Sequence, residues 1–381
     1  MSPLTYTDAV GGALERLRGV GFEHGPRFVN HAPMAAEALA YMGYADDVPR
    51  WVDRNLRTHT YHEVPDARWA IDPADPDDWR SALGDFSRVA DWTALFEREL
   101  ALTPWPEVLA RWWPRLLPGM SGVLTHGVIR TAHAVRAISR AGEENLAYRR
   151  ELAQGLGYWA ARYASHTHGI RPGDEYPGTG EGGGDPRTGG GGGGPRTGGG
   201  GGGPRTGGGG GGPRTGGGGV PRAGDGEQVP RAGDGEQVPR TADADSAAAA
   251  LDGLVAEYAG IYASAPQRHP VPLIHSITGP AAVRLVVEHL PAAQRRPSYL
   301  VARDVSASML DWFSTTPVTT LPVGLSGVPD LGEVFATAVA IGDEHAIKLA
   351  EVAVRHQALA PDPRLAAAAH AANQGLARFR R

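Results

Sequence analysis

The residues best suited to chemistry in this chain are one lysine and a set of histidines. Lys348 is the only lysine, because thirty-six of the thirty-seven basic residues are arginine. Unlike arginine, a buried lysine can lose its proton, act as a nucleophile or be modified covalently. Lys348 follows His345 by three residues in an apolar stretch typical of a helix, so the two side chains share one helical face. The alternative interpretation is a lysine that snorkels from a partly buried helix.

Histidines are numerous, with fourteen in the chain. Five of them stand among apolar neighbours in helical or helix-start contexts: His31, His126, His133, His275 and His345. A single histidine of this kind is more often an ordinary core or surface residue, so the hypothesis rests on the set. Neutral imidazole is the commonest metal ligand in proteins, and no cysteine is present to take that role. We therefore expect a metal site whose ligands are three or four of these five histidines, with Lys348 as a further, modified ligand or otherwise as a charged contact to substrate.

His126 and His133 are seven residues apart, which is two helical turns. Both side chains then point the same way, but they lie about 10 Å apart along the helix axis. This spacing favours one of them as a ligand and the other as a residue that positions substrate or supports a ligand. Arg130 lies between them and can orient a carboxylate or an oxyanion, which makes it a candidate catalytic residue beside Lys348. An ion pair on the helix surface is the alternative for Arg130.

Several chemistries are excluded by what the sequence lacks. Without cysteine there are no disulfides, thiolate nucleophiles, iron–sulfur clusters or cysteine-type zinc sites. No glycine fingerprint follows a strand pattern, and neither a Walker A sequence nor a Gly-x-Ser-x-Gly elbow occurs. The Glu-x-x-His pattern of diiron helices and the His-Glu-x-x-His pattern of zinc proteases are also missing. Asp343 and Glu344 remain as carboxylates that can support a nearby ligand.

The hydrophobic spacing predicts an all-α fold in which Asn30 caps a helix over residues 31–39. Further helices are expected to begin near Asp8, near Asp46 and at Pro104. Longer helices are expected over 79–102, 121–140, 143–165, 246–264, 280–290, 330–358 and 363–380. Residues 299–301 are the best candidate for a strand.

A low-complexity segment over residues 173–245 interrupts this pattern. It contains three copies of a nine-residue unit, Pro-Arg-Thr followed by six glycines, and two copies of a second repeat. Such a composition offers almost nothing to bury, so we expect a disordered surface loop. The remaining roughly 310 residues are enough for one large core, so residues 1–381 are predicted to form a single helical domain with this insert.

Charge and hydropathy argue against two classes of partner. The net charge is −5 and no run approaches eighteen apolar residues. Neither nucleic acid nor a membrane is therefore expected as a partner. The first residues lack the pattern of a signal peptide, which predicts a cytoplasmic protein.

The segments around the histidines resemble the questin oxidase-like family. The resemblance is carried by residues 30–39, 83–86, 91–92, 96, 113–116, 126–136, 272–278 and 343–348. Together they span most of the chain outside the low-complexity segment. The resemblance implies an oxidoreductase of secondary metabolism that oxidises and opens rings of anthraquinone-type polyketides, in a Baeyer–Villiger-like or dioxygenase-like reaction.

A non-haem Fe(II) centre held mainly by histidines suits that implied chemistry, because iron with an open position can bind O₂ beside a flat aromatic substrate. Zinc, copper and nickel also suit imidazole ligands. The common pattern of two histidines and one carboxylate lacks an obvious carboxylate here. A neutral Lys348 could supply one by taking up CO₂ to form a carbamate, and NADPH is a candidate reductant.

Two other functions fit the same residues. One is a Baeyer–Villiger-type oxidase that uses NADPH or flavin from solution and binds no metal. The other is a non-catalytic helical binding protein whose histidines are core residues.

Overall fold

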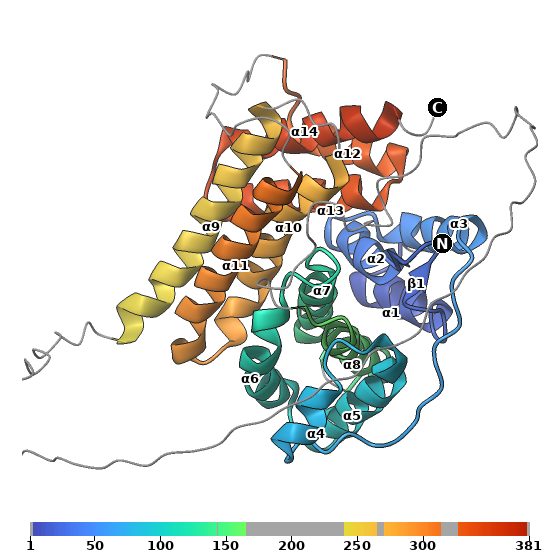
Figure 1. Cartoon of the computed structure of the whole chain (residues 1–381). Helices are drawn as coiled ribbons and strands as arrows, with labels where there is room; N and C mark the ends of the chain where they lie inside the picture. The colour runs from blue at the N-terminus through green and yellow to red at the C-terminus, as the bar shows by residue number, and fades with distance from the viewer. Residues whose placement is uncertain (1–2, 143, 165–239, 265–269, 314–326, 379–381) are drawn as a thin grey trace, which may run out of the picture. The chain divides into compact units, whose positions relative to one another are not determined.

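Helices dominate the computed structural model of this chain, which describes residues 3–142, 144–164, 240–264, 270–313 and 327–378 (Figure 1). Fourteen α-helices and one two-stranded hairpin occur in this described part. The prediction of an all-α fold is therefore confirmed. Most of the predicted low-complexity loop, residues 173–239, lies outside the described residues.

The N-terminal region places three helices around a short hairpin. Its elements are α1 (Tyr6–Arg16), β1 (Glu23–His24), β2 (Phe28–Val29), α2 (Ala32–Tyr41), the 3-10 turn η1 (Ala45–Asp47) and α3 (Val48–Thr58). The hairpin, which was not predicted, pairs Glu23 with Val29. Asn30 follows it, and its side-chain oxygen accepts a hydrogen bond of 3.0 Å from the amide of Ala32. Asn30 thus caps the start of α2 as predicted, although the helix begins one residue later than expected.

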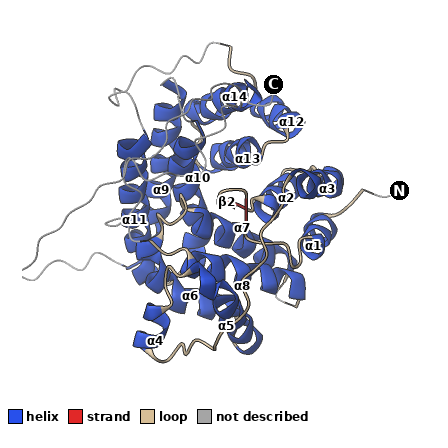
Figure 2. Cartoon of the chain, turned by 45° about the vertical axis from the view of Figure 1, so that its right-hand side comes forward, coloured by secondary structure: helices blue, strands red, loops and turns tan. Residues whose placement is uncertain are grey.

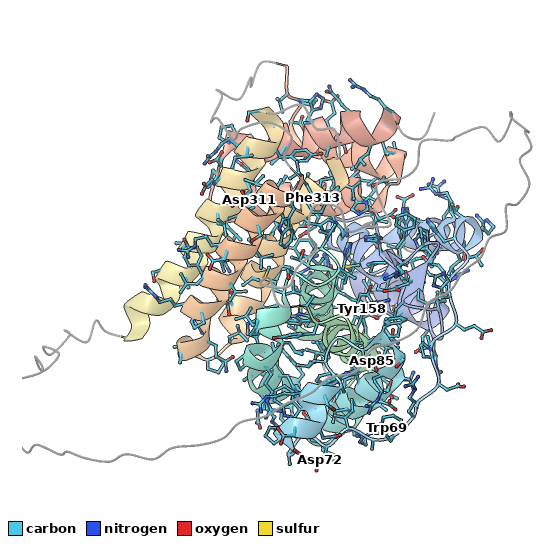
Figure 3. The ribbon with its side chains drawn as sticks, viewed as in Figure 1. Trp69, Asp72, Asp85, Tyr158, Asp311 and Phe313 are labelled. Atoms are coloured by element: carbon cyan, nitrogen blue, oxygen red, sulfur yellow. The ribbon has the colours of Figure 1, made fainter. Side chains whose placement is uncertain are left out.

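Tyr158 anchors the hairpin to the rest of the molecule (Figure 3). Its ring stacks on Phe22 with centroids 5.4 Å apart, and its hydroxyl donates a 3.0 Å hydrogen bond to Glu23. Glu23 is buried and also accepts from the guanidinium of Arg162. The segment leading into α2 is therefore held against α8 by one apolar and two polar contacts.

The middle of the chain forms five α-helices and two 3-10 turns: α4 (Pro76–Ser81), η2 (Phe86–Arg88), α5 (Val89–Leu102), α6 (Trp105–Leu116), η3 (Leu117–Gly119), α7 (His126–Ala141) and α8 (Leu146–Ala161). The prediction of one helix over 79–102 is wrong. Gly84 adopts a left-handed conformation with φ +76°, which ends the helical path. Asp85 then accepts from the amide of Ser87 and starts η2.

The C-terminal half contains α9 (Arg240–Ser264), α10 (Pro270–Val286), η5 (Val287–His289), α11 (Ala292–Phe313), α12 (Leu331–Ile341), α13 (Glu344–Leu359) and α14 (Pro363–Arg378). The strand expected at 299–301 lies inside α11, so that prediction is wrong.

The helix expected over 330–358 is two helices, because Gly342 turns the chain with φ +70° and Asp343 caps α13. Helix α9 starts within the expected loop, where alternating alanines favour a helix.

Helix α7 lies at the centre of the fold, between α8, α10 and α2 (Figures 1 and 2). The described residues before and after the insert belong to one compact unit, in which α2 packs on α13 and α7 packs on α10. Large aromatic side chains fill much of the interior, including Trp92, Trp112, Trp113 and Trp159, which are almost fully buried. None of the described helices has the length and apolar character needed to cross a bilayer.

Close helix packing makes two glycines respond oppositely to the same substitution. A Cβ at Gly157 in α8 would lie 2.9 Å from Thr93 Oγ1 and 3.0 Å from the Thr93 backbone nitrogen of α5. We expect Gly157→Ala to destabilise the protein by about 1–3 kcal/mol through overpacking. At the exposed Gly253 of α9 a Cβ meets no atom within 4 Å, so Gly253→Ala should stabilise by up to about 1 kcal/mol.

Urea denaturation of both variants measures this difference. A Gly157→Ala protein as stable as the wild type would show that α5 and α8 are not packed this closely.

Candidate metal centre

Three histidines from three different helices meet in the interior. His31 precedes the first residue of α2, His126 is the first residue of α7, and His345 is the second residue of α13. Each offers a ring nitrogen, and these nitrogens all lie within 4.8 Å of one another. All three residues are buried. The helix packing thus brings together side chains that are 95 and 219 residues apart in sequence.

His275 of α10 is the fourth member of this group. Its ring centroid lies 4.3 Å from that of His126 and 5.5 Å from that of His345. The helix was expected to begin at residue 280, but α10 begins at Pro270. His275 was expected near the start of a helix, and it lies inside one. We refer to His31, His126, His275 and His345 as the histidine group.

A strained turn sets the orientation of His126. Val123, Leu124 and Thr125 all have left-handed backbone conformations, with φ of 42°, 52° and 62°. Such conformations are unfavourable for residues other than glycine, and runs of them are found chiefly where function requires a fixed geometry. The turn places the Val123 carbonyl oxygen against His126 Nδ1. His126 Nδ1 therefore carries the proton and donates it, which leaves Nε2 with a free lone pair.

That lone pair faces His31, whose Nε2 lies 2.6 Å away. Because His126 Nε2 is an acceptor, His31 Nε2 donates the proton in this contact. His31 Nδ1 has no hydrogen-bond partner and lies 3.5 Å from Glu344 Oε1. Moving the proton of His31 to Nδ1 would direct it at this carboxylate and free Nε2. A carboxylate behind an imidazole is the usual support of a histidine that binds a metal.

Burial keeps three of the four imidazoles neutral. It lowers the pKa of His31, His126 and His275 well below the usual value, and the positive charge of Lys348 lowers each further. The N-terminal ends of α2, α7 and α13 lie at the group and also disfavour added positive charge. Neutral imidazoles keep the lone pairs that a metal ion requires.

Lys348 is buried among these groups, with 1% of its surface exposed. Its Nζ has no hydrogen-bond partner. Burial lowers the pKa of its ammonium to about 8, although Glu344 and Asp343 oppose the shift. The amine therefore loses its proton far more readily than an exposed lysine does.

The donor set fits a metal ion. Buried polar atoms are nearly always satisfied in proteins, and each exception needs an explanation such as an ion. Both ring nitrogens of His275, Nδ1 of His31 and Nζ of Lys348 are buried without a partner. Two imidazole nitrogens on one ion are about 3 Å apart, so the 2.6 Å contact of His31 and His126 would need to open only slightly.

The structure does not bring Arg130 and His133 into this group, although both were candidates from the sequence. Arg130 donates two hydrogen bonds, of 2.7 and 2.9 Å, to the carboxylate of Glu151 in α8 and a third to Gln154. His133 Nδ1 lies 2.7 Å from Glu37 Oε2. Of the two histidines on α7, His126 therefore faces the group and His133 faces a carboxylate.

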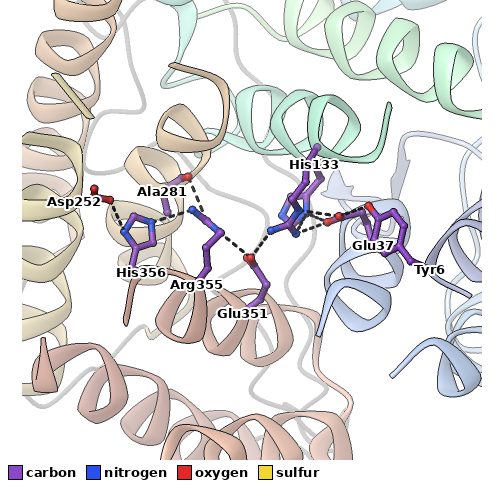
Figure 4. Close-up of polar contacts among 9 residues, drawn as sticks. Tyr6, Glu37, His133, Asp252, Ala281, Glu351, Arg355 and His356 are labelled. Carbon is purple, nitrogen blue, oxygen red and sulfur yellow. Dashed lines mark hydrogen bonds and ion pairs between the residues drawn. The ribbon is translucent and has the colours of Figure 1, made fainter. Parts of the chain in front are cut away.

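That carboxylate belongs to a buried charge network (Figure 4). Arg136 donates to Glu37 through Nε and Nη2, and to Glu351 through Nη1 at 2.5 Å. Glu351 also accepts a 2.9 Å hydrogen bond from Arg355. The outer members are Tyr6, which donates to Glu37, and His356, which lies between Arg355 and Asp252.

A weak signal for this network is present in the sequence. Glu37 and Glu351 each stand in an otherwise apolar helical stretch, where a carboxylate must be paired to be buried. Asp343 caps α13 by accepting from the amide of His345, and its carboxylate also lies 3.5 Å from His345 Nδ1, where it can support that ring.

Comparison with known proteins assigns this chain to no family. A scan against models of protein families finds no match, and a search of curated proteins finds no significantly similar sequence. The resemblance to the questin oxidase-like family stays a prediction.

The charge network should make stability depend on pH. Burial alone would raise the pKa of Glu37, but the charge of Arg136 and the hydrogen bond from His133 hold it at about 2. Because this value is below that of an unfolded glutamate, the stabilisation is complete above about pH 4.5 and is lost as pH falls toward 2. We expect the free energy of unfolding to fall by up to about 3 kcal/mol from this group.

Urea denaturation between pH 6 and pH 3 measures the effect, with Glu37→Gln as the comparison. The variant should be less stable at pH 6 and lose less stability on acidification. Equal losses in both proteins would contradict the assignment to Glu37.

Proposed function

We propose that this protein is an oxidoreductase that uses a non-haem iron ion, held by the histidine group, to oxidise or open the ring of a polycyclic aromatic substrate with O₂. The observation that carries the proposal is the convergence of four buried imidazoles, in which both ring nitrogens of His275 and Nδ1 of His31 have no hydrogen-bond partner. Iron would supply the electrons and the open position needed to react with O₂.

The chain's own residues would hold and shield this ion. His31, His126 and His345 each direct one nitrogen into the same space, and His275 lies beside them. Glu344 would hold the proton of His31, and the Val123 carbonyl already holds that of His126. Burial of all four rings excludes water, which strengthens binding and limits side reactions.

Lys348 would complete the ligand set as a carbamate. A metal dication beside a buried ammonium would be repelled, since both are positive and poorly solvated. The neutral amine can instead attack CO₂, forming an N–C bond and releasing one proton, to give an anion in the same place. Three helix N-termini at the group favour such an anion. Loss of the proton is eased by the lowered pKa of Lys348.

The substrate class follows from the resemblance rather than from a contact. An anthraquinone-like polyketide is the proposed substrate, with NADPH as a candidate reductant. The two rival functions, a metal-free oxidase using NADPH or flavin and a non-catalytic binding protein, leave the unpartnered nitrogens of His275 without a purpose.

Metal content tests the proposal. Protein purified without chelator and loaded with Fe(II) without oxygen should hold about one ion per chain. His345→Ala should lower its affinity by at least about tenfold, because a ligand is lost. The control is His370→Gln, which removes a histidine of α14 that belongs neither to the group nor to the charge network and should keep the full metal content.

Elemental analysis and isothermal titration give the measurement. A wild-type protein that binds no metal would overturn the proposal. Turnover with NADPH by that metal-free protein would then favour the first rival, and the lack of turnover the second.

Substitution of Lys348 tests the carbamate. Lys348→Ala should lose most of its iron affinity, and a small carboxylate such as acetate should restore part of it by filling the vacated place. Lys348→Arg should not bind iron normally, because it keeps the positive charge and cannot take up CO₂.

Labelling with ¹³C-bicarbonate gives a direct readout, as the wild type should show a carbamate carbon signal that both variants lack. Normal iron content in Lys348→Arg would contradict this role.

A further inference from the structure

The central contacts of the charge network lie on the same four helices as the histidine group. Glu37 of α2, Glu351 of α13 and Ala281 of α10 each lie six residues after the histidine that their helix contributes. On α7 the corresponding residue is Arg136, ten residues after His126. At a rise of 1.5 Å per residue, the network lies about 9–15 Å along the helices from the histidines.

Arg136 joins three of these helices through one planar group. Its Nε and Nη2 both donate to Glu37 of α2, and its Nη1 donates to Glu351 of α13. A two-pronged contact of this kind fixes the direction as well as the distance between partners. Arg355 extends the connection to α10, since it donates to Glu351 and lies 3.4 Å from the carbonyl oxygen of Ala281.

Fixing a helix at this point also fixes its histidine. An α-helix is stiff over two or three turns, so rotation of α13 about its axis would move Glu351 and His345 together. The charges balance within the network, with Glu37, Glu351 and Asp252 facing Arg136, Arg355 and Arg284. Rotating any one helix would leave a buried charge without its partner, which is strongly unfavourable.

We infer that Glu37, Arg136 and Glu351 are positioning residues that hold α2, α7 and α13 in the rotation at which the histidine group converges. This inference rests on the proposed function for its first readout, metal affinity. The network would fix the rotation of each helix about its axis. Packing of the apolar core does not do this, since apolar contacts tolerate rotation more readily than paired charges do.

The chain offers a matched control in the pair Arg130–Glu151. It is equally buried, it is also two-pronged, and it starts from the same helix, α7. It joins α7 to α8, whose sequence contains no histidine. Loss of this pair should therefore reduce stability without moving the histidine group.

The experiment compares full-length wild type, Glu351→Gln, Glu37→Gln and Glu151→Gln by titration with Co(II), a spectroscopic substitute for iron. We expect Glu351→Gln and Glu37→Gln to bind Co(II) roughly 10- to 100-fold more weakly and to show altered visible absorption bands. Glu151→Gln should keep the affinity and the spectrum of the wild type. Thermal denaturation shows how closely the variants match in stability.

Two results would overturn the inference. One is an unchanged Co(II) affinity and spectrum in Glu351→Gln and Glu37→Gln. The other is an equal loss in Glu151→Gln, which would reduce the effect to general destabilisation. If Glu351→Gln fails to fold, Arg136→Lys replaces it, because this variant keeps the charge but loses the planar fork.

A second readout separates this inference from the proposed function. If the wild type binds no Co(II), the proposed function fails. The ¹⁵N NMR chemical shifts of the imidazoles in metal-free protein then test the inference by themselves. The contact between His31 and His126 should then change in Glu351→Gln and stay unchanged in Glu151→Gln. Identical shifts in all proteins would overturn it.

Discussion

The packing of α2, α7 and α13 depends on the buried charge of Arg136. A guanidinium removed from water is tolerated only when carboxylates replace its hydration, and Glu37 and Glu351 do so from two separate helices. Each carboxylate is itself buried, and the charge of the arginine stabilises it there. The need to keep these charges paired therefore links the three helices. Apolar side chains impose no such need, because they accept many packing arrangements.

The interior contains two polar regions with opposite properties. In the charge network each buried guanidinium is paired with a carboxylate, although Glu351 Oε2 has no hydrogen-bond partner. In the histidine group several nitrogens have no partner, and the charged residues beside it are Glu344, Asp343 and a lysine whose pKa is lowered by burial. The paired charges of this network are accounted for by the helix contacts that they make. Unsatisfied nitrogens in a protein core indicate a ligand, so the second region carries the proposed function.

Local sequence predicted the helices well and their breaks poorly. Apolar spacing located the helical stretches on both sides of the insert, and Asn30 hydrogen-bonds the start of α2 as expected. The breaks at Gly84 and Gly342 were missed, because a glycine within an apolar pattern is compatible with either a helix or a turn. Helix α11 was missed because Tyr299 and Val301 favour strands, and packing against α9 and α10 overrides that preference.

The sequence by itself determined the chemical types: one lysine, no cysteine, and histidines placed on apolar helices. It also determined that His345 and Lys348 share a face, because helical periodicity is local. Only the tertiary structure decided which histidines meet. His126 and His133 are equivalent by spacing, yet one faces His31 and the other Glu37. That choice depends on how the neighbouring helices are rotated and packed. Contacts between side chains far apart in the sequence control this packing.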